Sequence, residues 1–134
     1  MNTFTLDVVT PNGSVYSAKE VELVVLHTET GEMGVMAGHI PTVAALKTGY
    51  VKVNKASGTE YLAVSEGFVE VRTNKVTVLV QAAETADEID KDRAINSKER
   101  AEERLKMNSD EVDFRRAERA LHRAINRIEV AKFR

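Results

Sequence analysis

Val76-Thr77-Val78-Leu79-Val80-Gln81-Ala82-Ala83-Glu84-Thr85-Ala86 is the stretch in which this chain of 134 residues changes character. Its first half consists of β-branched and apolar residues typical of a strand, and its second half consists of helix formers. All seven glycines and both prolines precede it, between Pro11 and Gly67. Because these two residue types mark turns, the sequence predicts a first part that turns often and a second part that hardly turns. We place the boundary near Glu84, which gives domains 1–84 and 85–134.

The first part has the pattern of a β-sandwich or barrel with antiparallel strands. Residues 3–9 alternate polar and apolar side chains and stop at Thr10-Pro11-Asn12-Gly13, as a strand before a turn does. Gly31-Glu32-Met33-Gly34 and Gly38-His39-Ile40-Pro41 have the composition of turns. Short strands at this spacing are typical of antiparallel sandwiches and barrels. The further predicted strands are 21–27, 49–53, 60–65, 68–72 and 76–80.

The second part is predicted to be two helices. Acidic residues at Asp87, Glu88 and Asp90 suit a first helical turn, although the first helix can also begin three or four residues later. Asn108-Ser109-Asp110-Glu111 offers a cap and an acidic first turn to the second helix. The break therefore lies near Met107 to Ser109.

The apolar stripes of these helices are thin and rich in alanine. Alanine lets helices approach closely but buries little area, so the hairpin is expected to be only marginally stable without another contact. The stripe residues are Ile89, Ala94, Ala101 and Leu105 on the first helix, then Phe114, Ala117, Leu121, Ala124 and Ile128 on the second.

Composition excludes several classes of site. The chain has no cysteine, which rules out disulfides and thiolate metal sites, and its three histidines are too scattered for a zinc site. It has no phosphate-binding loop of the Walker type and no nucleophile-elbow pattern, so the sequence gives no support for catalysis. No apolar run approaches the roughly 20 residues that span a bilayer, and the amino terminus lacks a signal-peptide pattern, so a soluble, cytoplasmic protein is expected.

Charge is concentrated and balanced in the second part, where residues 84–134 carry 13 basic and 13 acidic side chains. Helical spacing aligns the arginines on one stripe of each helix, 93, 100 and 104 on the first and 116, 119, 123 and 127 on the second. These stripes are either solvated faces paired with nearby acids or, if brought together, an anion site for phosphate. A nucleic-acid surface is disfavoured, because acids match the bases and no aromatic residue lies within either stripe.

Segments along the whole chain resemble those of one family, in that family's order. Ile89-Asp90-Lys91-Asp92-Arg93-Ala94 is similar to the I/L-D-x-x-R-A motif of the ε subunits of bacterial F-type ATP synthases, and Arg123-Ala124-Ile125-Asn126-Arg127 resembles the arginine pair that completes the ATP site of that family. The upstream matches are Val9-Thr10-Pro11-Asn12-Gly13, Gly34-Val35-Met36-Ala37-Gly38-His39-Ile40-Pro41, Ala63-Val64-Ser65-Glu66-Gly67-Phe68-Val69-Glu70-Val71-Arg72 and Gln81-Ala82-Ala83-Glu84.

The resemblance implies a sandwich of about ten strands followed by a two-helix hairpin. It also implies a non-catalytic subunit on the central stalk at the cytoplasmic face of the cell membrane, which binds the γ subunit and the c-ring of this proton-translocating enzyme. Glu32 and His39 are the implied contacts there, although a structural role for His39 in its own turn is equally open. When the helices extend into the α/β head, basic residues restrain ATP hydrolysis, and the candidates are Arg115, Arg116, Arg119 and Arg123.

In family members that bind ATP, the folded hairpin holds it without magnesium, and no cofactor is required. The resemblance places Glu84, Ile89, Asp90 and Ala94 around the adenine, and Arg93, Arg100, Arg123 and Arg127 at the phosphates. The alternative is a free-standing ATP-binding sensor, which would bind nucleotide equally well but would show no affinity for γ.

Overall fold

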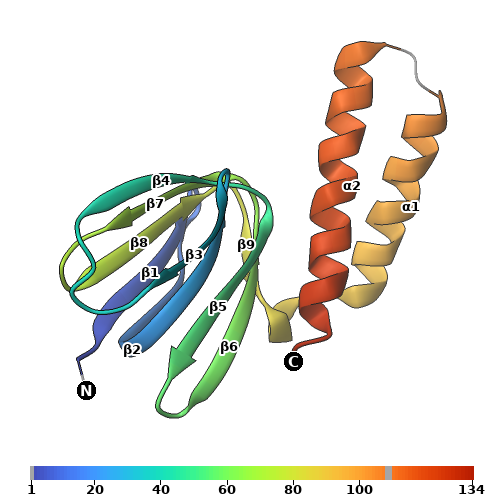
Figure 1. Ribbon diagram of the computed structural model, residues 1–134. Coiled ribbons are helices and arrows are strands. Elements are labelled where there is room, and N and C mark those ends of the chain that lie inside the picture. Colours follow the sequence, from blue (N-terminus) through green and yellow to red (C-terminus); the bar gives the residue numbers. More distant parts are fainter. Residues whose placement is uncertain (1, 108–109) are drawn as a thin grey trace.

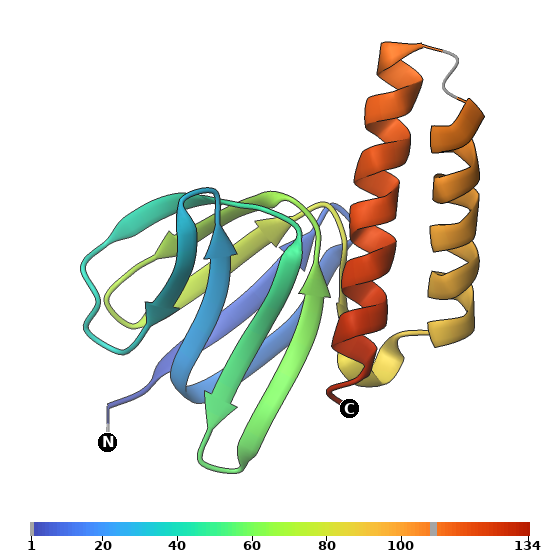
Figure 2. The same ribbon diagram turned by 45° about the vertical axis from the view of Figure 1, so that its right-hand side comes forward.

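The computed structural model describes residues 2–107 and 110–134. A β-domain is followed by two antiparallel helices, and α2 lies closer to the β-domain than α1 does (Figures 1 and 2). The elements in chain order are β1 (Phe4–Thr10), β2 (Gly13–Thr28), β3 (Gly31–Val35), β4 (Thr42–Leu46), β5 (Gly49–Lys55), β6 (Gly58–Val64), β7 (Gly67–Val71), β8 (Lys75–Val80), β9 (Ala83–Thr85), the 3₁₀ turn η1 (Ala86–Glu88), α1 (Lys91–Met107) and α2 (Glu111–Ala131).

The strands follow the order β1-β8-β7-β4-β2-β5-β6-β9, with β3 added to β2 and with β1 also pairing β2. The long strand β2 therefore belongs to both layers, and the sheet folds back on itself as a sandwich (Figure 1). Among the described strands, β1 and β8 are paired in parallel, whereas the remaining pairs are antiparallel.

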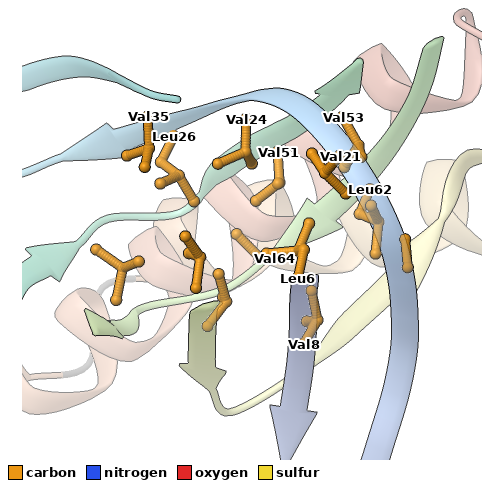
Figure 3. Packing of buried hydrophobic residues seen from close by; sticks show 14 of the residues in the cluster. Leu6, Val8, Val21, Val24, Leu26, Val35, Val51, Val53, Leu62 and Val64 are labelled. Atoms are coloured by element: carbon orange, nitrogen blue, oxygen red, sulfur yellow. The ribbon is translucent and has the colours of Figure 1, made fainter. Parts of the chain in front are cut away.

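Alternating side chains of the strands fill the space between the two layers. Phe4, Leu6 and Val8 of β1 point inward, as their alternation with polar neighbours predicts. Leu26, Val53 and other fully buried residues of the facing strands pack around them (Figure 3). This core consists mainly of valine and leucine, together with Phe4 and Ala18, and it belongs to the β-domain alone.

The β-sandwich followed by two helices confirms the fold class, but several expected boundaries are wrong. Gly31–Val35, which has the composition of a turn, is strand β3, because it pairs with the second half of β2 and the turn is moved to Glu29 and Thr30. Thr42–Leu46 is a further strand that the sequence did not indicate. The described part of the chain holds nine strands, and the β1–β8 pair is parallel where only antiparallel pairs were expected.

The end of the stretch 76–86, in which the chain changes character, is also a strand. Ala83–Thr85 forms β9 against β6, where the helix-forming residues predicted a transition, because pairing with Leu62 to Val64 overrides their local preference. The first helix begins at Lys91, later than the sequence boundary. Asp110 caps α2 by accepting a hydrogen bond from the Asp113 N–H at 2.8 Å, which confirms the acidic cap. Asn108 and Ser109, the expected helix break, lie outside the described residues.

Glu20 has a left-handed backbone conformation, with φ of 59°, although it lies inside strand β2. It sits where the pairing with β1 shifts, between the partners Ala18 and Val21. We expect Glu20→Val to lower the free energy of unfolding by about 1–2 kcal/mol, because a β-branched side chain is strained at positive φ. Glu20→Gly is the matched control, which removes the Cβ and is expected to leave stability within about 1 kcal/mol. Equal urea midpoints for the two variants would contradict this assignment of strain.

Candidate functional site

The hairpin is held against the β-domain by a second apolar cluster at the end of α2. Val130 and Ala131 pack with Ile89 and Ala86 from the connection after β9 and with Ala63 of β6. Just beyond the helix, the Phe133 ring stacks on the Tyr61 ring with centroids 4.1 Å apart, and it meets Tyr50 edge-on. These contacts fix the two helices as a hairpin folded onto the sandwich.

Two polar contacts reinforce the same interface. The Asn126 side-chain amide donates to the Gly49 carbonyl oxygen at 2.8 Å, and an Arg134 guanidinium N–H donates to the Ile89 carbonyl oxygen at 2.9 Å. The first carbonyl belongs to the start of β5 and the second to the connection between η1 and α1, while both donors come from the C-terminal part of the chain. The carboxyl end of α2 therefore carries the docking contacts.

Beside this interface, Glu84 forms a two-point ion pair with Arg127. The Arg127 Nε lies 2.6 Å from Glu84 Oε1, and its terminal nitrogen donates to Oε2 at 3.3 Å. Glu84, Arg127 and Arg123 line a small hollow. The end of β6, Ser65 just after it and the connection between β8 and β9 also line this hollow. Three of the residues implied at the nucleotide site are thus brought together between the domains.

The two helices meet along the expected alanine seam. Ala94 and Ala101 of α1 and Ala117 and Ala124 of α2 are all buried, which confirms the thin apolar stripes in their central part. Leu105, Leu121 and Ile128 are only half-buried, and Phe114 is exposed at the far end of the hairpin. Little apolar area holds the helices together, so the folded hairpin depends on the contacts at the base of α2.

This seam places the arginines of both helices on one side. On each helix, a residue one position before or three positions after a seam residue lies to the same side of the seam. Because the two helices run antiparallel, these positions face the same side of the hairpin on both helices. One hollow of the structure confirms the sidedness, since Arg104 of α1 and Arg116 of α2 both line it. We call this side the arginine face, and its residues are Arg93, Arg100, Arg104, Arg116, Arg123 and Arg127.

The residues implied around the adenine have structural contacts of their own. Ile89 is buried in the interface cluster and Ala94 in the helix seam. The Asp90 carboxylate accepts a hydrogen bond from the Arg93 N–H at 3.0 Å and so caps α1. Arg93 and Arg100 are exposed on the arginine face, and one Arg100 nitrogen donates to Ser97 Oγ at 3.1 Å.

The implied partner contacts are spread over several parts of the structure. Glu32 is exposed on β3, and the half-buried His39 ring contacts the Ile40 carbonyl oxygen through Nδ1 at 2.7 Å, within its own turn. Arg116 and Arg123 belong to the arginine face, whereas Arg119 lines the groove between α2 and the sandwich. Arg115 is exposed.

Sequence reasoning missed the groove between α2 and the sandwich. His27, Tyr50 and Phe133 line it, with Arg119 and His122 from α2. The His27 and Tyr50 rings meet edge-on with centroids 4.4 Å apart, and the His27 ring packs closely over Gly49. The pairing of β2 with β5 and the docking of α2 on the sandwich together bring these residues into one groove, so no local sequence signal could have revealed them.

The side chains with perturbed pKa values lie on the sandwich, away from the arginine face. The Ser17 hydroxyl, at 2.6 Å, is the main cause that lowers the pKa of Asp7, and Lys75 adds to it. Burial, together with the charge of Glu60, raises the pKa of Tyr16, and the hydrogen bond to Glu60 raises that of Lys55. Asp7 and Lys55 each pair with a charged residue of an adjacent strand, as surface ion pairs do, whereas the hydrogen bond from Tyr16 to Glu60 joins β2 and β6, which are not adjacent in the sheet.

The Glu84–Arg127 pair is expected to stabilise the docked hairpin by about 1 kcal/mol, since both side chains are partly exposed and solvent screens them. A double-mutant cycle with Glu84→Gln and Arg127→Gln, followed by urea unfolding, measures this coupling. The Lys132–Glu129 pair is the matched control, because it joins residues of one segment and should show almost no coupling. A coupling for Glu84 and Arg127 no larger than the control would contradict the bridging role.

Among the described residues, no group of three or more potential ligands is placed to hold a metal ion. In the same residues, neither helix has the length and apolar character that crossing a membrane requires.

Comparison with known proteins finds two family models that together match almost the whole chain. The β-sandwich domain of the ATP synthase delta/epsilon chain matches residues 3–86, and the long α-helix domain of the same chain matches residues 87–132. The chain is 63% identical to the ATP synthase epsilon chains of Staphylococcus aureus strains JH9 and Newman, over 100% of both sequences.

Two solved structures share the fold. A chain of the Euglena gracilis mitochondrial ATP synthase, in a structure of its OSCP, F1 and c-ring, aligns with a TM-score of 0.80 at 26% identity, over 98% of this chain and 82% of that chain. A chain from the central stalk and c-ring of the Tetrahymena thermophila mitochondrial enzyme aligns with a TM-score of 0.59 at 14% identity, over 98% and 96%.

Proposed function

The chain belongs to the delta/epsilon chain family of ATP synthase, and from this we propose that its sandwich couples the rotor to the catalytic head while its hairpin regulates ATP hydrolysis. As an epsilon chain it is a subunit of the central stalk and not itself a catalyst. Its place is at the cytoplasmic face of the cell membrane, as part of the proton-translocating complex. The observation that carries the regulatory part is the small, separable interface between the two domains.

An exposed apolar patch on β4, β7 and β8 supports docking of the sandwich to the γ subunit. Val43 is 71% exposed, Phe68 56% and Leu79 44%, and strand pairing places Phe68 directly opposite Leu79. Contiguous apolar side chains of this size on a sheet face favour a protein interface. Glu32 lies on β3 and His39 lies in the connection between β3 and β4 of the same domain. We assign both residues to contacts with γ and the c-ring.

Release of the hairpin from the sandwich is expected to require little free energy, which suits a regulatory element. Its own seam is mostly alanine, and its docking contacts are confined to the base of α2. Balanced charge lets the helices exchange partners without leaving many ions unpaired. In the extended state, we assign Arg115, Arg116, Arg119 and Arg123 to contacts with an acidic segment of the β subunit, which restrain ATP hydrolysis.

The folded hairpin is proposed to bind ATP without magnesium on the sandwich end of the arginine face. Arg93, Arg100, Arg123 and Arg127 supply guanidinium groups for the phosphates. Near Ile89 and Ala94, the carboxylates of Glu84 and Asp90 can accept hydrogen bonds from the adenine amino group. In the structure Arg127 is paired with Glu84, so phosphate must compete with this carboxylate.

Calorimetric titration of the whole chain with ATP, in the absence of magnesium, tests this site. We expect saturable binding that Arg93→Ala and Arg127→Ala each abolish, while Lys106→Ala, on the opposite side of α1, leaves it unchanged. ATP at 100 times its dissociation constant should stabilise the folded state by about 2.7 kcal/mol. Unchanged affinity for ATP in both arginine variants would rule out the site. A separate titration with the γ subunit that shows no binding would favour a free-standing ATP sensor instead.

A further inference from the structure

The arginine face is longer than the proposed nucleotide site. Arg104 and Arg116 continue it toward the free end of the hairpin, where they line a hollow together with Met107, Asp113 and Ala117. Arg93 and Arg104 are separated by eleven residues of helix, about 16 Å along the axis. The four arginines assigned to ATP cover only the part nearest the sandwich.

Positive charge exceeds negative charge at the outer part of the face, where Asp113 lies beside Arg104 and Arg116. Within the described residues, neither Arg104 nor Arg116 has a hydrogen-bond or ion-pair partner, and both are exposed. Of the acids on α1 and α2 whose side chains the structure describes, Asp113 is the one on this side. Six guanidinium groups therefore share a surface with Asp113 at its free end and with Glu84 and Asp90 at its sandwich end.

The space between the two rows of arginines is lined by small side chains. Ser97 of α1 and Ala120 of α2 occupy the position three residues after a seam alanine, on the same side as the arginines. Both side chains are much shorter than arginine, which leaves room for an extended chain of phosphates between the rows. A face with two parallel rows of charge and a low centre fits a linear anion better than a compact one.

We propose that the arginine face binds a linear polyphosphate chain along its length, with Arg104 and Arg116 as a subsite beyond the nucleotide site. Each phosphate unit offers oxygens to the paired N–H donors of a guanidinium group. Polyphosphate has no bases, so its binding requires no side chains that recognise bases. Single-stranded nucleic acid is disfavoured, because the described part of this face carries no aromatic side chain on which bases could stack. The inference deepens the proposed function, on which it rests only at the sandwich end.

The test compares two ligands, inorganic triphosphate and long-chain linear polyphosphate, by calorimetric titration of the full chain without magnesium. The double variant Arg104→Ala/Arg116→Ala is expected to weaken polyphosphate binding about tenfold while changing triphosphate affinity less than about twofold. Lys91→Ala/Lys106→Ala is the matched control, since it removes the same charge from the other side of α1 and should leave both affinities unchanged. Polyphosphate affinity should also fall as salt rises.

The outcomes separate this inference from the nucleotide site. If polyphosphate binds and the double variant weakens it, the inference stands even where ATP fails to bind. Equal loss in the lysine control would show general charge attraction and overturn it, as would unchanged polyphosphate affinity in the arginine variant. An oligonucleotide of matched charge that competes as well as polyphosphate would assign the face to nucleic acid instead.

Discussion

Gly67→Ala is expected to lower the free energy of unfolding by about 3 kcal/mol or more, at or above the upper end of overpacking costs. An added Cβ would lie 2.0 Å from the Leu79 carbonyl oxygen and 2.8 Å from the Val80 Cα. Both are backbone atoms of the neighbouring strand β8, so no side-chain rotation relieves the clash. The β7 and β8 backbones must separate at the Gly67–Val80 pair, which breaks the ladder beneath the proposed γ-binding patch.

Gly34→Ala is the matched control for this prediction. It lies in β3, and its added Cβ would meet the Leu23 Cδ1 at 3.6 Å, an ordinary van der Waals contact. We expect its stability to stay within about 1 kcal/mol of the unchanged chain, as measured by urea unfolding. Similar midpoints for the two alanine variants would show that the close β7–β8 approach does not constrain the fold.

Val130→Asp is expected to release the hairpin from the sandwich while the β-domain stays folded. Val130 is fully buried in the interface cluster with Ile89 and Ala63. Among the described residues, the cluster around Val130 contains no basic side chain that could neutralise a carboxylate, and burying one would cost several kcal/mol, more than an interface of this size is expected to supply. The sandwich core has no residue in this cluster and should retain its own stability.

Amide hydrogen exchange measures this release directly. In Val130→Asp, we expect the α1 and α2 amides to exchange at least about tenfold faster, while those of β1, β7 and β8 stay protected. Ile125→Asp on the same helix is the matched control, because Ile125 is 39% exposed and its carboxylate would remain solvated. Helix protection that is the same in both variants would mean that the interface cluster does not hold the hairpin.

The sequence predicted those features that depend on local pattern. Alternation in β1 identified a strand with Phe4, Leu6 and Val8 inside, and helical spacing identified the alanine seam. The acidic cap at Asp110 was likewise predictable, because a cap satisfies backbone groups within its own turn.

The errors concern segments whose structure is decided by distant partners. Gly31–Val35 is a strand because β2 extends far enough to pair with it. Ala83–Thr85 is a strand because β6 offers it backbone hydrogen-bond partners on the side that does not pair with β5. The site shows the same limit. Spacing placed arginines on one stripe of each helix, but only the antiparallel packing of the seam shows that the two stripes form one face. The ion pair of Arg127 with Glu84 joins residues 43 positions apart and has no local signature.

ATP hydrolysis by a complex reconstituted with the α, β and γ subunits tests the division of labour between sandwich and hairpin most directly. The full chain is compared with a chain that lacks residues 87–134, the part matched by the helical family model up to residue 132. We expect the shortened chain to bind γ as the full chain does and to give higher ATPase activity. Loss of γ binding, or ATPase activity equal to that with the full chain, would contradict a docking sandwich with a regulatory hairpin.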